Sequence, residues 1–231
     1  MIAFSLDIDW APEEVIQDSL ELFELYKIKC TLFSTHDSKV IRTSNKDLFE
    51  VGIHPNFNNL INGLTKEGES ATKIIKDLME IYPEAKGVRS HSMTQSSRLL
   101  SLFKENGLEY DSNQFLPYNW EIKPYECWTG IKRIPYNWED DVHFAYKKKF
   151  NFFFNRIFDV NKNFIFDFHP IHIYLNTDSE LTYLNAKPFY HNPYELLKKR
   201  NNIIEGTRDF LINLFEFINL NKLETKKMIE I

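Results

Sequence analysis

Cysteine, glycine and proline are scarce in this chain, with 2, 7 and 9 residues respectively among 231. Cys30 and Cys127 are too few and too far apart for a disulfide framework or a thiolate zinc site, so two buried or unreactive thiols are expected. Because apolar residues make up 43% and aromatic residues 15% of the chain, the composition excludes collagen-like, linker-dominated and disordered proteins. No linker divides the sequence, so we expect a single domain over residues 1–231.

The chain also lacks an excess of positive charge and a long hydrophobic run. A net charge of −5 argues against nucleic-acid binding, which needs a clustered cationic surface. No stretch reaches the roughly 18 uninterrupted apolar residues of a membrane helix, and even the Phe-rich stretch 150–158 is interrupted by Asn151, Asn155 and Arg156. The first residues have a strand pattern instead of the basic and apolar regions of a signal peptide. The sequence therefore predicts no membrane span and a cytoplasmic location, and it leaves the oligomeric state open.

What the chain does contain is a repeated pattern of strand followed by helix. Residues 2, 4, 6 and 8 are apolar and residues 3, 5, 7 and 9 are small or acidic, which predicts a strand with Asp7 and Asp9 on one face. Pro12 then begins a helix that extends to Lys27. Further strands are expected at 28–34, 51–54, 87–91, 108–111, 130–134 and 163–169, and further helices at 70–82, 94–106 and 208–220. This order predicts an α/β fold with a mostly parallel sheet, open or closed into a barrel.

Polar side chains stand at the ends of four expected strands: Asp7 and Asp9, His54, Arg89 and His91, and His169. Because the carboxyl ends of parallel strands meet at one edge of a sheet, these side chains are expected to converge. Carboxylate oxygen and neutral imidazole nitrogen both bind zinc, so the set suits a divalent metal site. Taken alone, the two aspartates suit a simple strand-end pair equally well.

Two segments carry a family resemblance: residues 4–10, FSLDIDW, and residues 50–58, EVGIHPNFN. They are similar to the first two motifs of the NodB-like polysaccharide deacetylases, the carbohydrate esterase 4 superfamily. The resemblance implies that Asp7 is the catalytic base and that Asp9 and His54 bind the metal. Asn58 stands where a second metal-binding histidine is usual. It is the expected third ligand, although an amide oxygen binds zinc more weakly than imidazole does.

Two more segments resemble later motifs of the family, in the same order. Residues 87–92, GVRSHS, resemble the third motif and imply that Arg89 orients the catalytic Asp7. Residues 164–169, FIFDFH, resemble the last motif and imply that His169 is the general acid. Residues 138–141, WEDD, lie where the family often has an Asp and a Trp near that acid. The whole match implies a distorted (β/α) barrel of the NodB type, with mostly parallel strands.

The resemblance implies metal-dependent hydrolysis of an N- or O-linked acetyl group on a sugar, with zinc the expected divalent metal. It also implies a carbohydrate or glycan-precursor substrate and a role in cell-surface polysaccharide biosynthesis. Aromatic residues between 115 and 138 could stack on a sugar, although most are expected in the core. Four other histidines are expected to be surface, loop or structural residues: His36, His143, His191, and His172, which strand alternation would turn away from His169.

Three other functions fit parts of the sequence. Asp7 and Asp9 could form the carboxylate pair of a metal-independent, EDTA-resistant glycoside-cleaving enzyme, but the other strand-end side chains would then have no role. A non-catalytic carbohydrate-binding relative would account for Asn58 and the other departures from the motifs. A helix-rich interaction scaffold would explain the late helices but none of the strand-end residues.

Overall fold

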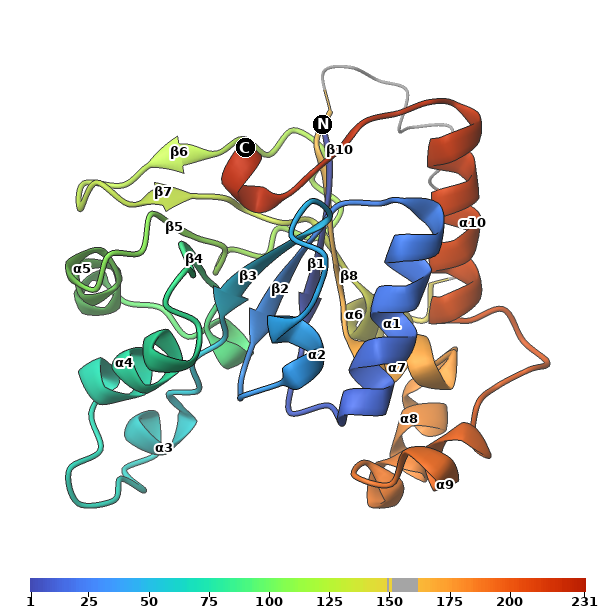
Figure 1. The fold of residues 1–231 in the computed structure, drawn as a ribbon, viewed down its shortest axis with the longest axis horizontal. Coiled ribbons are helices and arrows are strands. Elements are labelled where there is room, and N and C mark those ends of the chain that lie inside the picture. Colours follow the sequence, from blue (N-terminus) through green and yellow to red (C-terminus); the bar gives the residue numbers. More distant parts are fainter. Residues whose placement is uncertain (149, 151–161) are drawn as a thin grey trace.

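The computed structural model describes residues 1–148, 150 and 162–231, which are organised around one large sheet (Figure 1). The strands are β1 (Ile2–Asp7), β2 (Cys30–Ser34), β3 (Phe49–Ile53), β4 (Gly87–Val88), β5 (Tyr110–Asp111), β6 (Tyr125–Glu126), β7 (Lys132–Arg133), β8 (Trp138–Glu139), β9 (Phe164–Phe168) and β10 (Thr225–Lys226). The helices are α1 (Glu13–Tyr26), α2 (Lys39–Arg42), α3 (Asn58–Ile61), α4 (Ala71–Ile81), α5 (Ser97–Glu105), α6 (Asp140–Ala145), α7 (Pro170–Leu175), α8 (Glu180–Ala186), α9 (Pro193–Leu197) and α10 (Thr207–Leu220).

β1 lies inside the sheet, between β2 and β9, and the full order is β6-β7-β5-β4-β3-β2-β1-β9-β8, with β10 also paired to β1. All of these pairs are parallel except β6 with β7. The segment 132–139 leads from β7, beside β5, to β8, beside β9, so a short stretch links opposite sides of the sheet. The expected α/β fold is confirmed, and its mostly parallel sheet curls into a distorted, incomplete barrel.

Both faces of β1 are covered, and all six of its residues are buried. On one face Phe4 packs against Phe215 of α10, with ring centroids 5.3 Å apart, and Figure 1 shows α1 and α10 side by side over this face. On the other face lie Ala3, Ser5 and Asp7, the first in a small apolar cluster and the others in a polar network. A parallel strand buried on both sides is normally apolar throughout, so these polar residues mark a site.

The long helices follow the sequence pattern closely. Helices α1, α4, α5 and α10 begin and end within three residues of the expected bounds. Ser70 and Ser96 cap α4 and α5, and each side chain accepts a hydrogen bond from a backbone N–H of the first turn, as helix N-caps commonly do. The shorter helices have only four to seven residues, too few for the apolar periodicity that predicts a helix.

β4 is shorter than expected, and this matters for the site. The strand expected at 87–91 ends at Val88, and a 3-10 turn begins at His91. Ser92 and Met93 in this turn have φ of 57° and 52°, a left-handed conformation that a strand cannot contain. Gly87 is required at the start of β4, because a Cβ there would lie 2.1 Å from the Tyr110 ring. Arg89 thus lies just after the end of β4, and His91 begins the turn that follows.

Three expectations about single residues are wrong. β1 ends at Asp7, and Asp9 follows it with φ of 43°, so strand alternation does not set the direction of its side chain. Pro170 begins helix α7, as proline often does, and His172 therefore lies near His169, with ring centroids 5.5 Å apart. His143, expected at the surface or in a loop, is fully buried on α6.

Other expectations concern the membrane and the thiols. Across 1–148 and 162–231, every helix is too short or too polar to cross a bilayer. Except for Phe150, the Phe-rich stretch 150–158 lies outside the described residues. Cys30 and Cys127 are free thiols, the first buried and the second half-buried.

Candidate functional site

A left-handed turn after β1 holds Asp9. Asp9 and Trp10 have φ of 43° and 57°, values that are uncommon outside glycine and strained for a bulky side chain. The Trp10 N–H donates to Thr35 Oγ1 at 2.9 Å, and Tyr190 Oη donates to the backbone oxygen of Asp9 at 2.6 Å. Two distant segments therefore fix a conformation of the kind that clusters at functional sites.

His54 and His91 both approach Oδ1 of Asp9. The Nε2 atom of His54, which follows β3, lies 3.2 Å from this oxygen, and the Nδ1 atom of His91 lies 3.0 Å from it. The ligand atoms of all three residues lie within 4.8 Å of one another. On a tetrahedral zinc ion with bonds of about 2.0–2.1 Å, ligand atoms are about 3.3–3.4 Å apart, which is close to both measured distances. The donor set and its spacing therefore fit a divalent metal.

Asn58 was expected from the sequence to be the third metal ligand. In the structure its side chain contacts Ser92, whereas His91 contacts Asp9. Asn58 begins α3, and its Nδ2 donates to Ser92 Oγ at 3.3 Å. The structure thus brings His91 onto the Asp9 carboxylate and directs Asn58 to the neighbouring turn. The sequence marks His91 as one of the strand-end side chains that were expected to converge with Asp9, but the family resemblance assigned the third ligand position to Asn58.

Arg89 joins two carboxylates near the candidate metal-binding cluster of Asp9, His54 and His91. Its Nη1 donates to Asp7 Oδ1 at 3.0 Å and to Ser5 Oγ at 2.9 Å, and it also forms an ion pair with Asp167 of β9. Ser5 Oγ donates to Asp167 Oδ1 at 2.5 Å. The expected contact between Arg89 and Asp7 is present. Sequence reasoning missed Asp167, although an acid inside the apolar run FIFDF was a visible signal.

The guanidinium of Arg89 is enclosed on its other sides. Its Nε donates to the backbone oxygen of Ser112 at 3.0 Å, and its Nη2 donates to Ser112 Oγ at 2.9 Å. It lies over the rings of Phe33 and Tyr136, at 4.6 and 4.1 Å from their centroids. Burial disfavours the charged form, but Asp167 and Asp7 outweigh it and raise the pKa of Arg89. Arg89 is therefore a permanent buried cation.

His169 directly follows β9 and approaches the second oxygen of the Asp9 carboxylate. Its Nε2 lies 3.8 Å from Asp9 Oδ2, and its Nδ1 lies 2.8 Å from Oδ1 of Asp140, the first residue of α6. The other oxygen of Asp140 accepts the backbone N–H of His169 at 2.9 Å. Asp140 belongs to the segment WEDD, which the resemblance placed near the acid.

The charges in this site shift three pKa values. Burial opposes the charged form of His169, but the Asp140 carboxylate outweighs it and holds the pKa of His169 well above its usual value. Burial works to raise the pKa of Asp9, yet hydrogen bonds with His54 and His91 hold it well below its usual range. Burial also opposes charge on His54, and Asp7 and Asp9 reverse this, so the pKa of His54 is raised. Metal binding at His54 would therefore release a proton.

A cavity of about 250 Å³ opens beside Asp9 and His169. Its other lining residues are Asp141, Phe144, Ala145, Ile171, His172, Glu180, Tyr183 and Tyr190. They come from α6, α7, α8 and the segment that follows α8. The cavity therefore borders the candidate metal-binding cluster at Asp9, on the side on which His169 lies.

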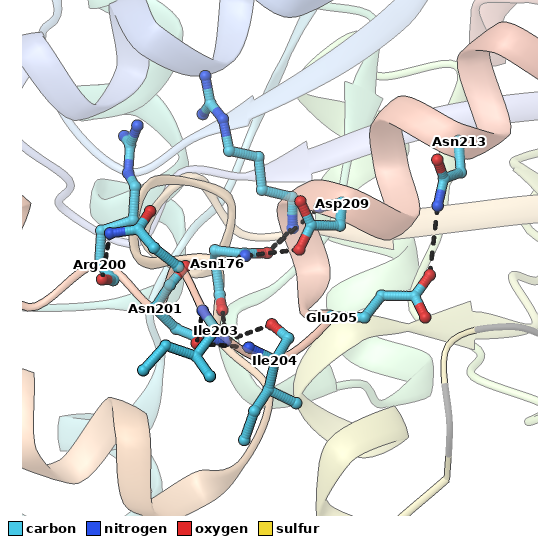
Figure 2. Close-up of a pocket in the computed structure, with 10 residues that line it drawn as sticks. Asn176, Arg200, Asn201, Ile203, Ile204, Glu205, Asp209 and Asn213 are labelled. Carbon is cyan, nitrogen blue, oxygen red and sulfur yellow. Dashed lines mark hydrogen bonds between the residues drawn. The ribbon is translucent and has the colours of Figure 1, made fainter.

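A larger hollow of about 530 Å³ lies around the loop before α10 (Figure 2). Its polar groups bond to one another: Asn176 Nδ2 donates to Asp209 Oδ2 at 2.7 Å, and Asn213 Nδ2 donates to Glu205 Oε1 at 3.2 Å. Both arginines that line it pair with Asp18 of α1. The hollow shares no lining residue with the cavity beside Asp9, so it is separate from the site.

Comparisons with known proteins support the sequence resemblance. A model of the WbmS-like polysaccharide deacetylase family matches residues 4–187. A crystal structure from Bordetella bronchiseptica, of a protein provisionally assigned as a polysaccharide deacetylase involved in O-antigen biosynthesis, is similar with a TM-score of 0.84. The two sequences are 36% identical, over 93% of this chain and 89% of that chain. None of the curated proteins compared with this chain matches it.

More distant structures share the fold alone. One is a protein from Mycobacterium smegmatis, provisionally assigned as a polysaccharide deacetylase, with a TM-score of 0.50 and 15% identity over 97% of this chain and 92% of that chain. Another is a 4-alpha-glucanotransferase from Thermococcus litoralis, with a TM-score of 0.53 and 12% identity over all of this chain and 37% of that chain. Because such different enzymes share this fold, function must be argued from the site.

Proposed function

Because the chain belongs to the WbmS-like polysaccharide deacetylase family, we propose that it is a metal-dependent hydrolase that removes an acetyl group from a sugar or glycan precursor. The relative from Bordetella bronchiseptica is described as involved in O-antigen biosynthesis, which supports a role for this chain in cell-surface polysaccharide biosynthesis. The carrying observation is the approach of two histidines to one oxygen of Asp9, with Asp7 near His54 and with His169 near the other oxygen of Asp9.

The proposed metal ligands are Asp9, His54 and His91. One carboxylate and two imidazoles form a common zinc-binding set that leaves a coordination position open, and zinc is the proposed ion. Asn58, which the sequence offered in place of a second histidine, supports the adjacent turn through Ser92. A bound divalent ion would polarise the acyl carbonyl and make a water molecule more acidic.

Asp7 is the proposed general base. Its Oδ2 lies 3.7 Å from His54 Nε2, so it borders the metal-binding cluster, while its Oδ1 is held by Arg89 at 3.0 Å. The buried guanidinium pairs with Asp7 and holds its carboxylate in place. Asp7 can therefore accept a proton from water as that water attacks the acyl carbon.

His169 is the proposed general acid. Asp140 keeps it protonated and fixes its ring through Nδ1, which leaves the Nε2 proton directed toward Asp9 and the cavity. A protonated imidazole in this position can donate a proton to the leaving nitrogen or oxygen of the sugar. Ligand atoms of Asp7 and His169 lie within 4.8 Å of each other, so the proposed proton acceptor and proton donor border the same site.

The first experiment measures the metal content of protein purified without chelator, together with acetate release from acetylated sugars. We expect close to one divalent ion per chain in the natural protein and in the matched variant Asn58→Ala. His54→Ala and His91→Ala should lose both the ion and the activity. Asp7→Asn and His169→Ala should keep the ion while activity falls by roughly 10²- to 10⁴-fold, the usual range for a positioned proton transfer.

Several outcomes would contradict the proposal. Metal loss in Asn58→Ala but not in His91→Ala would restore the ligand set expected from the sequence. Activity that resists EDTA would favour a metal-independent enzyme. No metal in any variant, even after reconstitution with zinc, would leave a carbohydrate-binding protein as the better account.

A further inference from the structure

Two of the three proposed metal ligands depend on the turn that follows β1. Asp9, in this turn, is itself a ligand, and the ring of Trp10 stands edge-on to the ring of His91, with centroids 5.1 Å apart. Asp9 and Trp10 have φ of 43° and 57°, a backbone conformation that costs free energy in residues other than glycine and persists only where other contacts impose it. If the turn relaxed, the Asp9 carboxylate would move and His91 would lose the packing of Trp10.

The peptide group between Asp9 and Trp10 is held at both of its polar atoms. Its oxygen, on Asp9, accepts a hydrogen bond of 2.6 Å from the hydroxyl of Tyr190, and its N–H, on Trp10, donates to Thr35 Oγ1 at 2.9 Å. Because a peptide group is planar and rigid, these two bonds fix its orientation. They therefore hold the two backbone angles on either side of it, ψ of Asp9 and φ of Trp10.

Tyr190 is a firm anchor for this peptide. It directly follows the 3-10 turn Lys187–Phe189, and its side chain packs against the main hydrophobic core. It lies 181 positions from Asp9 in the chain and just beyond residues 4–187, which the family model matches. The C-terminal part of the chain thus supports the backbone of a proposed metal ligand near the N-terminus.

We propose that Tyr190 is a positioning residue for the metal site and that its hydroxyl raises the affinity for the divalent ion by holding the peptide between Asp9 and Trp10. The inference rests on the ligand set of the proposed function. Ligands that are already in place before the ion binds lower the conformational cost of binding. Residues that hold metal ligands in this way commonly account for about 10- to 100-fold in metal affinity.

The test measures the zinc dissociation constant of the full-length natural protein and of Tyr190→Phe, by competition with a chromophoric chelator. Tyr190→Phe removes the hydroxyl but keeps the ring that packs on the core and lines the cavity beside Asp9. We expect zinc to bind about tenfold more weakly, at the lower end of the usual range, because the lost bond is to the ligand's backbone. The visible spectrum of the cobalt-loaded protein, which reports ligand geometry, should change as well.

Tyr174→Phe is the matched control. Tyr174 of α7 is buried, and its hydroxyl also donates to a backbone oxygen, that of Pro193, at 3.1 Å. It does not line the cavity beside Asp9. This variant therefore loses a similar bond elsewhere, and it should keep the zinc affinity and the cobalt spectrum of the natural protein. Thr35→Val removes the other bond to the same peptide, so it should weaken zinc binding as Tyr190→Phe does.

The outcomes separate this inference from the proposed function. Unchanged zinc affinity in Tyr190→Phe, or an equal loss in Tyr174→Phe, would overturn the inference and leave the deacetylase function standing. If Tyr190→Phe does not fold, unchanged zinc affinity in Thr35→Val would overturn it instead. No zinc binding by the natural protein would overturn both proposals. The expected loss of zinc affinity, in a protein that releases no acetate from acetylated sugars, would refute the deacetylase function and leave the role of Tyr190 standing.

Discussion

Replacing Arg89 by methionine is expected to destabilise the protein strongly. Arg89 is fully buried, and its guanidinium is the cation that Asp7 and Asp167 share. Without it, the buried side chains of Asp7 and Asp167 would lose the cation that they share. Methionine is long and apolar enough to remain between the rings of Phe33 and Tyr136, so the loss would report mainly the missing charge.

The expected size follows from the burial of all three groups. Removing one partner of a buried ion pair costs about 3–5 kcal/mol, because it leaves an uncompensated charge in a medium of low polarity. For a chain of this length, each 1 kcal/mol shifts the melting temperature by about 2–4 °C. Arg89→Met should therefore lower the melting temperature by about 6–20 °C.

Urea and thermal unfolding followed by circular dichroism measure this effect without any substrate. Buried carboxylates without a cation favour their protonated forms, so the loss in Arg89→Met should be smaller at pH 5 than at pH 8. Adding Asp167→Asn to the variant should recover part of the stability. A loss below about 1 kcal/mol, the usual size for an exposed pair, or the same loss at both pH values, would refute this account of Arg89.

Three other changes test the acid, the second carboxylate and a helix cap. Asp140→Asn should lower the pKa of His169, because the carboxylate that offsets the burial of its charge is removed. The alkaline limb of the pH profile of kcat/KM should then move to lower pH. An unmoved limb would exclude the pairing of His169 with Asp140. Burial raises the pKa of Asp167 to about 8, above the usual value of about 3.9, so its folded form keeps a proton that the unfolded chain loses as pH rises. Asp167→Asn should therefore gain stability relative to the natural protein between pH 4 and 8 in urea titrations, whereas a constant difference would contradict the shift. Glu13 accepts hydrogen bonds from Ser38 Oγ and from two N–H groups of α2, so Glu13→Ala should cost about 1 kcal/mol, and an unchanged urea midpoint would argue against this cap.

The sequence alone was sufficient for the main helices and for the strands that flank β1. Their apolar periodicity is local, and it is visible in one window of residues. It also indicated that Asp7, His54, Arg89 and His169 would converge, because the ends of parallel strands meet at one edge of the sheet. The strands β6, β8 and β10 were not expected; they have two residues each, which is too short for a period, so pairing with neighbouring strands defines them.

The partners within the site were decided by the tertiary structure. Asp167 reaches Arg89 because β9 pairs with β1 in a register that places Ser5 opposite Asp167, 162 positions apart in the chain. His91 meets Asp9 because β4 ends early and the chain turns where further strand was expected.

The physical reason for this division is the range of the interactions involved. The alternation of apolar side chains is set by backbone geometry within a few residues, so the sequence determined which segments form strands and which residues stand at their ends. The direction of the Asp9 carboxylate depends on a left-handed turn that Thr35 and Tyr190 hold from distant segments. Such bonds exist only after the chain has folded, as do the contacts of His91 with Asp9 and of Asn58 with Ser92.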